Sequence, residues 1–184
     1  MNHEQIIEAV RQWLERIVIG LDLCPFAKTE FVNNRIRLSV TEAVSQEQLL
    51  IDLKTELEIL NKAPDIETTL LIHPQVLEEF DDYNQFLNDA ERLLRETELE
   101  GIYQIASFHP DYQFAGTEPD DAENYTNKAP YPILHLLREE SIERAVSEHP
   151  DAAQIPERNV ALMNKLGQKK MRSLLISCFI KARK

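Results

Sequence analysis

The feature that most constrains this chain is an alternation of short β-type segments with amphipathic helices. Three segments carry the alternating or apolar pattern of strands: residues 35–40, 68–73 and 102–108. The first two are each followed by a stretch with apolar residues at every third or fourth position, which predicts helices that begin after Ser45 and at Asp81 or Asp82. Strands that alternate with helices are typical of crossover units in an α/β protein.

We therefore expect an α/β fold with a small mixed or mostly parallel sheet of three to four strands, packed by about six helices. The other helices are expected at four places: residues 2–20, 132–148, 156–166 and 169–182. Pro132 and Pro156 suit the first position of the helices that they open. The length of 184 residues, without a repeat or a linker, predicts a single globular domain over residues 1–184.

The composition excludes several classes of partner. Acidic residues outnumber basic ones by 32 to 20 and give a net charge of −12, whereas affinity for nucleic acid comes mainly from cationic contacts with phosphate. No apolar run approaches the roughly 20 residues of a membrane span. The N-terminus is polar, unlike a signal peptide, and Cys24 and Cys178 are too far apart to indicate a disulfide framework. These features predict a protein of the cytoplasm.

The charge is unevenly distributed along the chain. Residues 158–184 contain eight Lys or Arg and no Asp or Glu. This basic C-terminal segment predicts a solvated cationic helix face. The alternative is a surface that docks on an acidic partner, including another copy of the chain in a homo-oligomer.

A long ordered loop is expected after the third strand, over residues 109–131. Connections of this length are usually functional or disordered. The aromatic content of this one, which includes Tyr112, Phe114, Tyr125 and Tyr131, argues against disorder. An ordered loop with aromatic and polar side chains is typical of the wall of a binding site.

Two predicted strands end in the same way, in His73-Pro74 and His109-Pro110. If these strands are parallel, both imidazoles lie at the carboxyl edge of the sheet, where α/β proteins bind ligands. His109 is then a candidate general acid or base, with Asp111 as the carboxylate that orients its ring. In the alternative interpretation His109 binds loop backbone, Asp111 belongs to a turn, and His73 is a buried structural residue.

Other residues are candidates for binding an anionic substrate. His135 and Arg138 are three positions apart, which places them on one side of the predicted helix 132–148, and Arg138 could hold an anion by a bidentate contact. The remaining candidate substrate-binding residues are His73, Tyr112, Asn124, Tyr125, Asn127 and Lys128. The asparagines could instead satisfy the backbone of their own loop.

Cys24 is the outside candidate for a nucleophile. If Pro25 opens a short helix, Cys24 is its N-cap, and the helix terminus and Lys28 would lower the thiol pKa. The alternative is a small packed residue. His73, His109, Asp111 and His135 lack the spacing of a compact metal motif, so no metal is predicted. The few glycines do not form a nucleotide cradle, and the cofactor stays unassigned.

Several segments resemble one family. They are WLER at 13–16, GLDLCPFA at 20–27, LIHP at 71–74, FHPDYQFAGT at 108–117, NYTNKAPYP at 124–132 and LHLLRE at 134–139. Together they resemble the bacterial domain-of-unknown-function 1415 (DUF1415) family over nearly the whole chain. The resemblance implies no activity and lends no catalytic residues. This chain has Lys128-Ala129 where the family pattern has Arg-Ser, and its last helix is more basic and apolar.

Two functions remain open at this point. The first is a small enzyme that acts on a polar, anionic metabolite through His109, Asp111 and Arg138. The second is a non-catalytic ligand-binding or protein-interaction module that uses the loop 109–131 and the basic C-terminal helix. The first requires the histidine, Asn127 and the arginine to face a common pocket, whereas the second does not.

Overall fold

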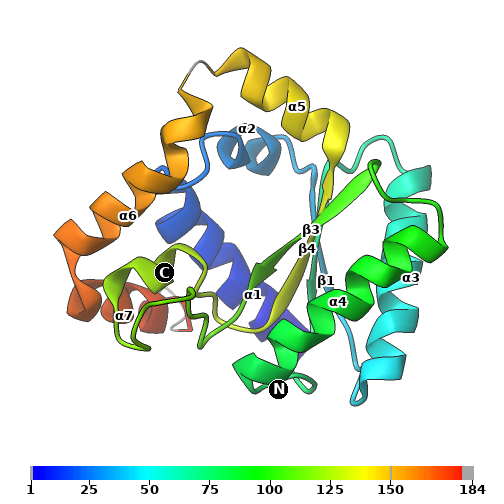
Figure 1. The fold of residues 1–184 in the computed structure, drawn as a ribbon, viewed down its shortest axis with the longest axis horizontal. Helices are drawn as coiled ribbons and strands as arrows, with labels where there is room; N and C mark the ends of the chain where they lie inside the picture. Colours follow the sequence, from blue (N-terminus) through cyan, green and yellow to red (C-terminus); the bar gives the residue numbers. More distant parts are fainter. Residues whose placement is uncertain (1, 150, 180–184) are drawn as a thin grey trace.

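The fold is an α/β arrangement around a four-stranded mixed sheet, seen in a computed structural model that describes residues 2–149 and 151–179 (Figure 1). The strands are β1 (Ile36–Val40), β2 (Thr68–Ile72), β3 (Tyr103–Phe108) and β4 (Ile133–Arg138). They lie in the order β1-β2-β4-β3. β1 and β2 are parallel, and β4 is antiparallel to both β2 and β3. β2 and β3 therefore run in the same direction.

Helices cover both faces of the sheet. The helices α3 (Gln46–Lys62) and α4 (Phe80–Glu96) lie on one face, and α1 (His3–Trp13) lies on the other (Figure 1). The crossovers β1-α3-β2 and β2-α4-β3 thus pass over the same face. This is expected of two right-handed crossovers, because β2 lies beyond β1 and β3 lies beyond β2 in the same direction across the sheet. The predicted α/β class and mixed sheet are confirmed.

Each face of the sheet has its own apolar core. Leu49, Leu53 and Leu57 of α3 pack with Tyr83 and Phe86 of α4 on one side, and all five are essentially inaccessible to water. Ile6, Val10, Trp13 and Ile17 fill the other side from the first helix. These are the positions three and four apart that the sequence pattern assigned to the inner faces of helices.

The predicted helix 2–20 begins as expected but changes its winding. Asn2 caps α1 by accepting a hydrogen bond from the backbone N–H of Glu4. From Leu14 to Ile19 the helix is a π-helix, a rare conformation that recurs at functional sites. A short helix α2 (Ala27–Val32) follows. Its N-cap is Phe26, so the prediction that Pro25 opens it with Cys24 as N-cap is wrong.

The predicted helix 132–148 is the main error in the fold. Residues 133–138 form β4, and only Glu139–Glu148 are helical, as α5. The run Ile133-Leu134-His135-Leu136-Leu137 is apolar at nearly every position. Such a run suits a central strand buried on both faces as well as it suits a buried helix. This segment is a strand because it lies between β2 and β3, whose backbone groups need hydrogen-bond partners on that side.

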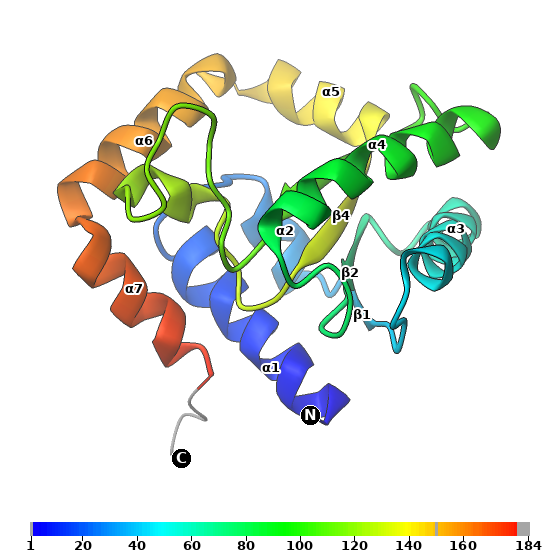
Figure 2. The same ribbon diagram turned by 60° about the horizontal axis from the view of Figure 1, so that its bottom comes forward.

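The remaining helices lie beyond α5. They are α6 (Ile155–Leu166) and α7 (Gln168–Ser177), with the 3-10 turns η2 (Ala122–Thr126) and η3 (Ala152–Gln154). Figures 1 and 2 both show α5 running from the end of β4 toward α6. The last positions of the predicted helix 169–182 lie outside the described residues. Among the residues described, no helix has the length and apolarity to cross a lipid bilayer.

Candidate functional site

The two His-Pro strand ends lie at the same edge of the sheet. Because β2 and β3 run in the same direction, His73 and His109 both follow carboxyl ends. The ring of Tyr83, from α4, contacts both: its centroid lies 5.7 Å from that of His73 and 5.1 Å from that of His109. The geometric condition for a shared histidine site is therefore met.

The hydrogen bonds of His109 match the structural alternative. The residue is inaccessible to water. Its Nε2 lies 3.2 Å from the carbonyl oxygen of Leu77, and its Nδ1 accepts a hydrogen bond of 3.0 Å from the backbone N–H of Asp111. Burial lowers the pKa of His109, so the ring is neutral and donates from Nε2. Both ring nitrogens are used by the fold.

Asp111 does not orient this ring through its carboxylate. Its backbone amide makes the contact, and its side chain is exposed. The predicted pairing of the imidazole with a carboxylate is therefore wrong. The backbone N–H of Asp111, in the turn after Pro110, is the donor that fixes the ring.

His73 binds the carbonyl of Val76, the residue that precedes Leu77. Its Nδ1 lies 2.9 Å from the carbonyl oxygen of Val76, and burial lowers its pKa to about 4. The two imidazoles thus hold consecutive carbonyls, those of Val76 and Leu77, in the loop between β2 and α4. Leu77 has a φ of 58°, which is strained for a branched side chain. The Nε2 atom of His73 is buried and has no hydrogen-bond partner among the described residues.

The predicted asparagines stabilise their own loop. Asn124, inaccessible to water, accepts hydrogen bonds from Phe114 N–H and the Thr117 hydroxyl, and donates to the carbonyl of Glu118. Asn127 donates to the carbonyl of Ser107 at 3.0 Å, which joins the loop to the end of β3. These contacts match the alternative that the sequence left open for both residues.

The aromatic and cationic candidates of the loop also contact the fold itself. Tyr112 packs between Phe80 and Phe114, with ring centroids 5.1 and 5.0 Å away. Lys128 donates from Nζ to the carbonyl of Pro119 at 3.1 Å, and this ammonium lies 5.1 Å from the ring centroid of Tyr125. Burial lowers the pKa of Lys128.

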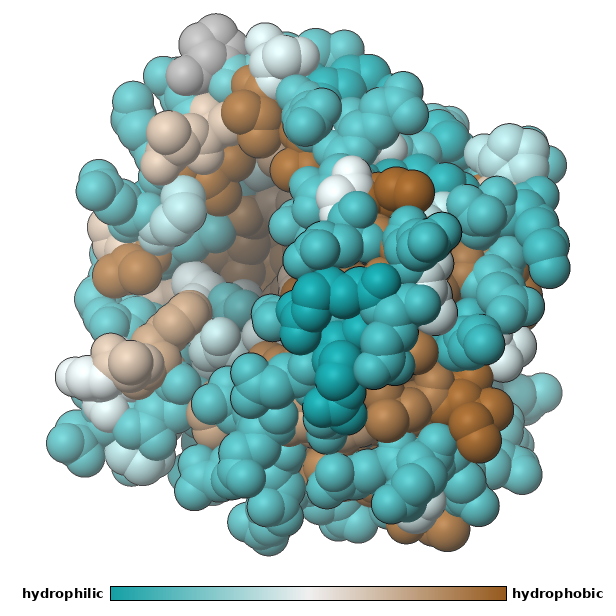
Figure 3. Space-filling view, turned by 45° about the vertical axis from the view of Figure 1, so that its right-hand side comes forward, coloured by the Kyte–Doolittle hydropathy of each residue, from teal (hydrophilic) through white to brown (hydrophobic). Residues whose placement is uncertain are grey.

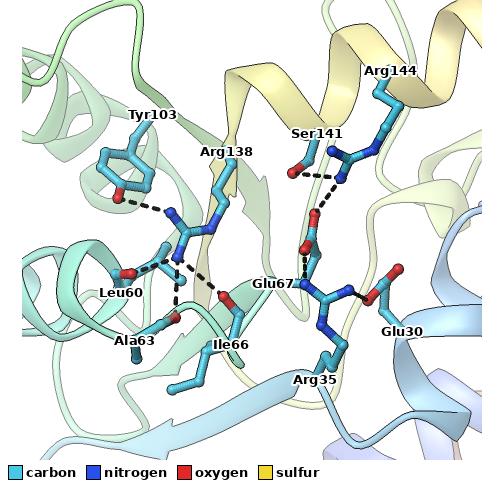
Figure 4. A network of polar contacts seen from close by, with 10 residues as sticks. All are labelled: Glu30, Arg35, Leu60, Ala63, Ile66, Glu67, Tyr103, Arg138, Ser141 and Arg144. Atoms are coloured by element: carbon cyan, nitrogen blue, oxygen red, sulfur yellow. Dashed lines mark hydrogen bonds and ion pairs between the residues drawn. The ribbon is translucent and has the colours of Figure 1, made fainter.

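Arg138 is a helix cap and does not face His109. Its guanidinium donates to carbonyls that end α3 and follow it, those of Leu60, Ala63 and Ile66, and to the Tyr103 hydroxyl (Figure 4). Cations stabilise a helix C-terminus through such contacts. Tyr103 pairs with Arg138 and Phe108 with Ile133. His109 and Arg138 therefore lie at opposite ends of β3, about 20 Å apart by strand rise, and the predicted common pocket is wrong.

His135 and Arg138 do not share a side. On a strand, residues three apart point to opposite faces, so the prediction based on a helix is wrong. His135 faces the α1 side of the sheet, where its ring centroid lies 6.0 Å from that of Phe108. Burial lowers its pKa to about 4, and the ring is therefore neutral at pH 7.

Cys24 has the properties of a packed thiol. It is half-buried and free. Burial raises its pKa, an effect only partly offset by the backbone amides of Phe26 and Ala27. The predicted lowering of this pKa is wrong, because the cost of burying the charged thiolate outweighs its contacts with these two amides. In the part of the chain that the structure describes, no three His, Cys, Asp or Glu side chains are grouped as metal ligands.

The α1 face of the sheet is open over its β3-β4 half. On this face α1 packs against β1 and β2, and its Trp13 also reaches β3, where the ring centroids of Trp13 and Phe108 lie 5.2 Å apart. Five residues of β3 and β4 on this face stay half-buried, as the residues of β1 do: Gln104, Ala106, Phe108, His135 and Leu137. Figure 3 shows a hollow in the left half of the molecular surface, with apolar side chains gathered in its depth. We call these five residues the open sheet face.

Sequence reasoning found only His135 of the open sheet face. The others were missed because β4 was assigned to a helix, which hid the pairing of His135 with Ala106. Thr68, which binds His135, was missed for the same reason. The available signal was the apolar run after Pro132, read as a strand rather than as a helix.

The fold and these contacts define a small α/β protein in which His109 and Cys24, two of the three predicted catalytic residues, are packed within the fold. The chain belongs to the family described as "Protein of unknown function (DUF1415)", which matches residues 5–173. The predicted family is thereby confirmed. No curated protein and no solved structure matches the chain.

Proposed function

We propose that this is a non-catalytic ligand-binding module of the cytoplasm and that the open sheet face is its site. The observation that carries the proposal is an imidazole nitrogen, Nδ1 of His135, that has no hydrogen-bond partner among the described residues. It lies on a half-buried surface that is otherwise mostly apolar. Ligand sites are typically concave and apolar, with a few polar groups that fix orientation. His109 is buried, and the guanidinium of Arg138 is bound to the carbonyls at the end of α3, so neither side chain is available to a substrate.

The protonation of His135 follows from its neighbours. The Thr68 hydroxyl donates its one proton to the carbonyl of Leu136 at 2.6 Å. It must therefore accept from Nε2–H of His135, which lies 2.7 Å away. Because the ring is neutral, Nδ1 carries a lone pair, and no described residue donates to it. The site thus offers a hydrogen-bond acceptor to a ligand.

The surroundings of this nitrogen indicate the kind of ligand. Ala106 pairs with His135 across the strands, and Phe108 contacts its ring. An apolar molecule with one O–H or N–H donor fits these groups. The predicted anionic ligand depended on Arg138 and Lys128, whose charges are directed at backbone carbonyls.

Phenol and anisole test this site as a pair of probes. They have similar apolar bodies, but only phenol can donate a hydrogen bond to His135. Phenol is expected to bind about two- to tenfold more tightly, since one hydrogen bond contributes roughly 0.5–1.5 kcal/mol. The measurement is the shift of backbone amide resonances on titration, which should be confined to residues 104–108 and 133–137.

Two substitutions complete the test. Ala106→Leu fills the open sheet face beside the imidazole and is expected to abolish phenol binding, whereas Ala115→Leu, in the exposed part of the loop, leaves it unchanged. Equal binding of phenol and anisole, or full binding to A106L, would contradict the proposed site.

The predicted homo-oligomer through the C-terminal helix stays a proposal. Ile176 and Phe179 are about half exposed, at 52% and 50%. They follow Lys169, Lys170 and Arg172, so this end of the chain presents both charge and apolar area. Sedimentation at several protein concentrations tests it: Ile176→Ser should leave a monomer if this surface joins two copies.

A further inference from the structure

We propose that a small cavity between α1, α2 and β1 is a second binding site, which takes a small carboxylate with an apolar body. The cavity has a volume of about 190 Å³. Its lining consists of four apolar and two polar residues: Leu14, Phe31, Ile36, Leu38, Arg11 and Asn34. It lies apart from the open sheet face, since Ile36 and Leu38 belong to β1 at the other edge of the sheet.

Local backbone geometry creates this cavity. α2 is only six residues long, and Asn34 turns the chain into β1 with a φ of 56°. Few residues other than Gly, Asn and Asp adopt this conformation readily. On the opposite wall, Leu14 is the first residue of the π-helix. π-helical turns are rare and recur at functional sites because they shift side chains from the helical register.

The guanidinium of Arg11 is the group that selects the ligand. It lies 5.8 Å from the ring centroid of Phe31. Within the described residues it has no ion pair or hydrogen bond, although acidic residues outnumber basic ones in the chain. Arg35, on the far side of the same turn, is paired with both Glu30 and Glu67, at 3.3 and 2.5 Å (Figure 4). Among the described residues that line the cavity, Arg11 is the one cation, and it is available to an external anion.

The size and charge of the cavity restrict the class of ligand. Its volume is below the roughly 300–1,000 Å³ of sites for drug-sized ligands, which indicates one ring or a short chain. One guanidinium matches one carboxylate, which it can bind through two parallel hydrogen bonds. The strongly negative protein disfavours a dianion such as phosphate. The four apolar lining residues then contact the body of the acid.

Benzoate and benzamide are the probes for this site. They share a ring and a planar head group, but only benzoate is charged. Titration should shift the amide resonances of Arg11, Phe31 and Asn34 with benzoate, and much less with benzamide. Arg11→Gln is expected to weaken benzoate binding by about tenfold or more, because a charge-assisted hydrogen bond contributes roughly 1.5–3 kcal/mol.

The control is Arg95→Gln, the same change at an exposed arginine of α4. It should leave benzoate binding unchanged, and both variants should unfold at the urea concentration of the unsubstituted protein, since both side chains are exposed. Equal binding of benzoate and benzamide, equal loss in the two variants, or shifts confined to residues 104–108 and 133–137 would each overturn the proposal. The last result would assign the acid to the open sheet face instead.

Discussion

Removal of a single ring, that of His109, is expected to weaken the fold. His109→Ala leaves the carbonyl of Leu77 and the amide of Asp111 without their partner and opens a void in the core. We expect the free energy of unfolding to fall by about 2–4 kcal/mol, as measured by urea denaturation. His3→Ala, at an exposed histidine, is the control and should change stability by less than about 0.5 kcal/mol. Unchanged stability in H109A would restore the catalytic interpretation.

For single residues, the sequence predicted where a side chain lies better than it predicted what that side chain binds. The His-Pro ends placed His73 and His109 correctly because a strand end depends on local residues. Their roles depend on the loop between β2 and α4, where Leu77, 32 residues before His109, accepts the bond from its ring. Likewise, the three carbonyl groups that Arg138 binds lie 72 to 78 residues before it. No local pattern contains such information.

Within the loop 109–131, the buried side chain of Asn124 makes three of the hydrogen bonds that hold the backbone in place. Asn124→Ala removes the acceptor for Phe114 and Thr117. We expect faster cleavage within this loop by a protease of broad specificity, because exposed segments that lose backbone anchors open locally. Asn88→Ala, at an exposed asparagine of α4, is the matched control. If N124A is cleaved no faster than N88A, this residue does not maintain the loop.

The end of α3 depends on Arg138. Arg138→Lys keeps the charge but cannot reach the hydroxyl and three carbonyls together. A loss of about 1–3 kcal/mol in stability is expected, with faster hydrogen exchange in the amides of the last turn of α3. Arg92→Lys, in a surface ion pair, should show neither effect. Exchange that speeds up equally throughout R138K would argue against a local cap.

Elements with a clear period were predictable from the sequence, and β4 was not. The helices α3 and α4 and the strand β2 follow repeats of 3.6 or short apolar runs between turn residues. The segment 133–138 carries apolar residues on both sides, Leu134 and Leu136 on one and Ile133 and Leu137 on the other, which removes the alternation that would identify a strand. Because this strand was predicted as a helix, His135 was assigned to the same side as Arg138 and not beside Ala106.

The stability of the whole molecule should decrease in mild acid. The pKa values of His73 and His135 are lowered to about 4 in the folded protein, against about 6.5 in the unfolded chain. Between these values the unfolded state binds protons that the folded state does not, so stability is complete above pH 6.5 or so and falls as the pH falls. Each histidine is expected to cost about 2 kcal/mol by pH 5, measured by urea denaturation at pH 7 and pH 5.

The variant His135→Gln serves as the control for this effect, because glutamine does not titrate. Its loss of stability between pH 7 and pH 5 should be smaller by about 2 kcal/mol. The lowered pKa of His109 acts in the same direction and is retained in H135Q. An identical pH dependence in both proteins would mean that the fold does not lower the pKa of His135.

The position of β4 has a consequence for how the protein is made. Strands from the first 108 residues occupy three places in the sheet and leave the place between β2 and β3 empty until residues 133–138 have been added. On the ribosome, the growing chain therefore exposes two unpaired strand edges that face one another for the time needed to synthesise that last strand. Such edges attract other chains, so newly made protein should depend on chaperones until the segment emerges.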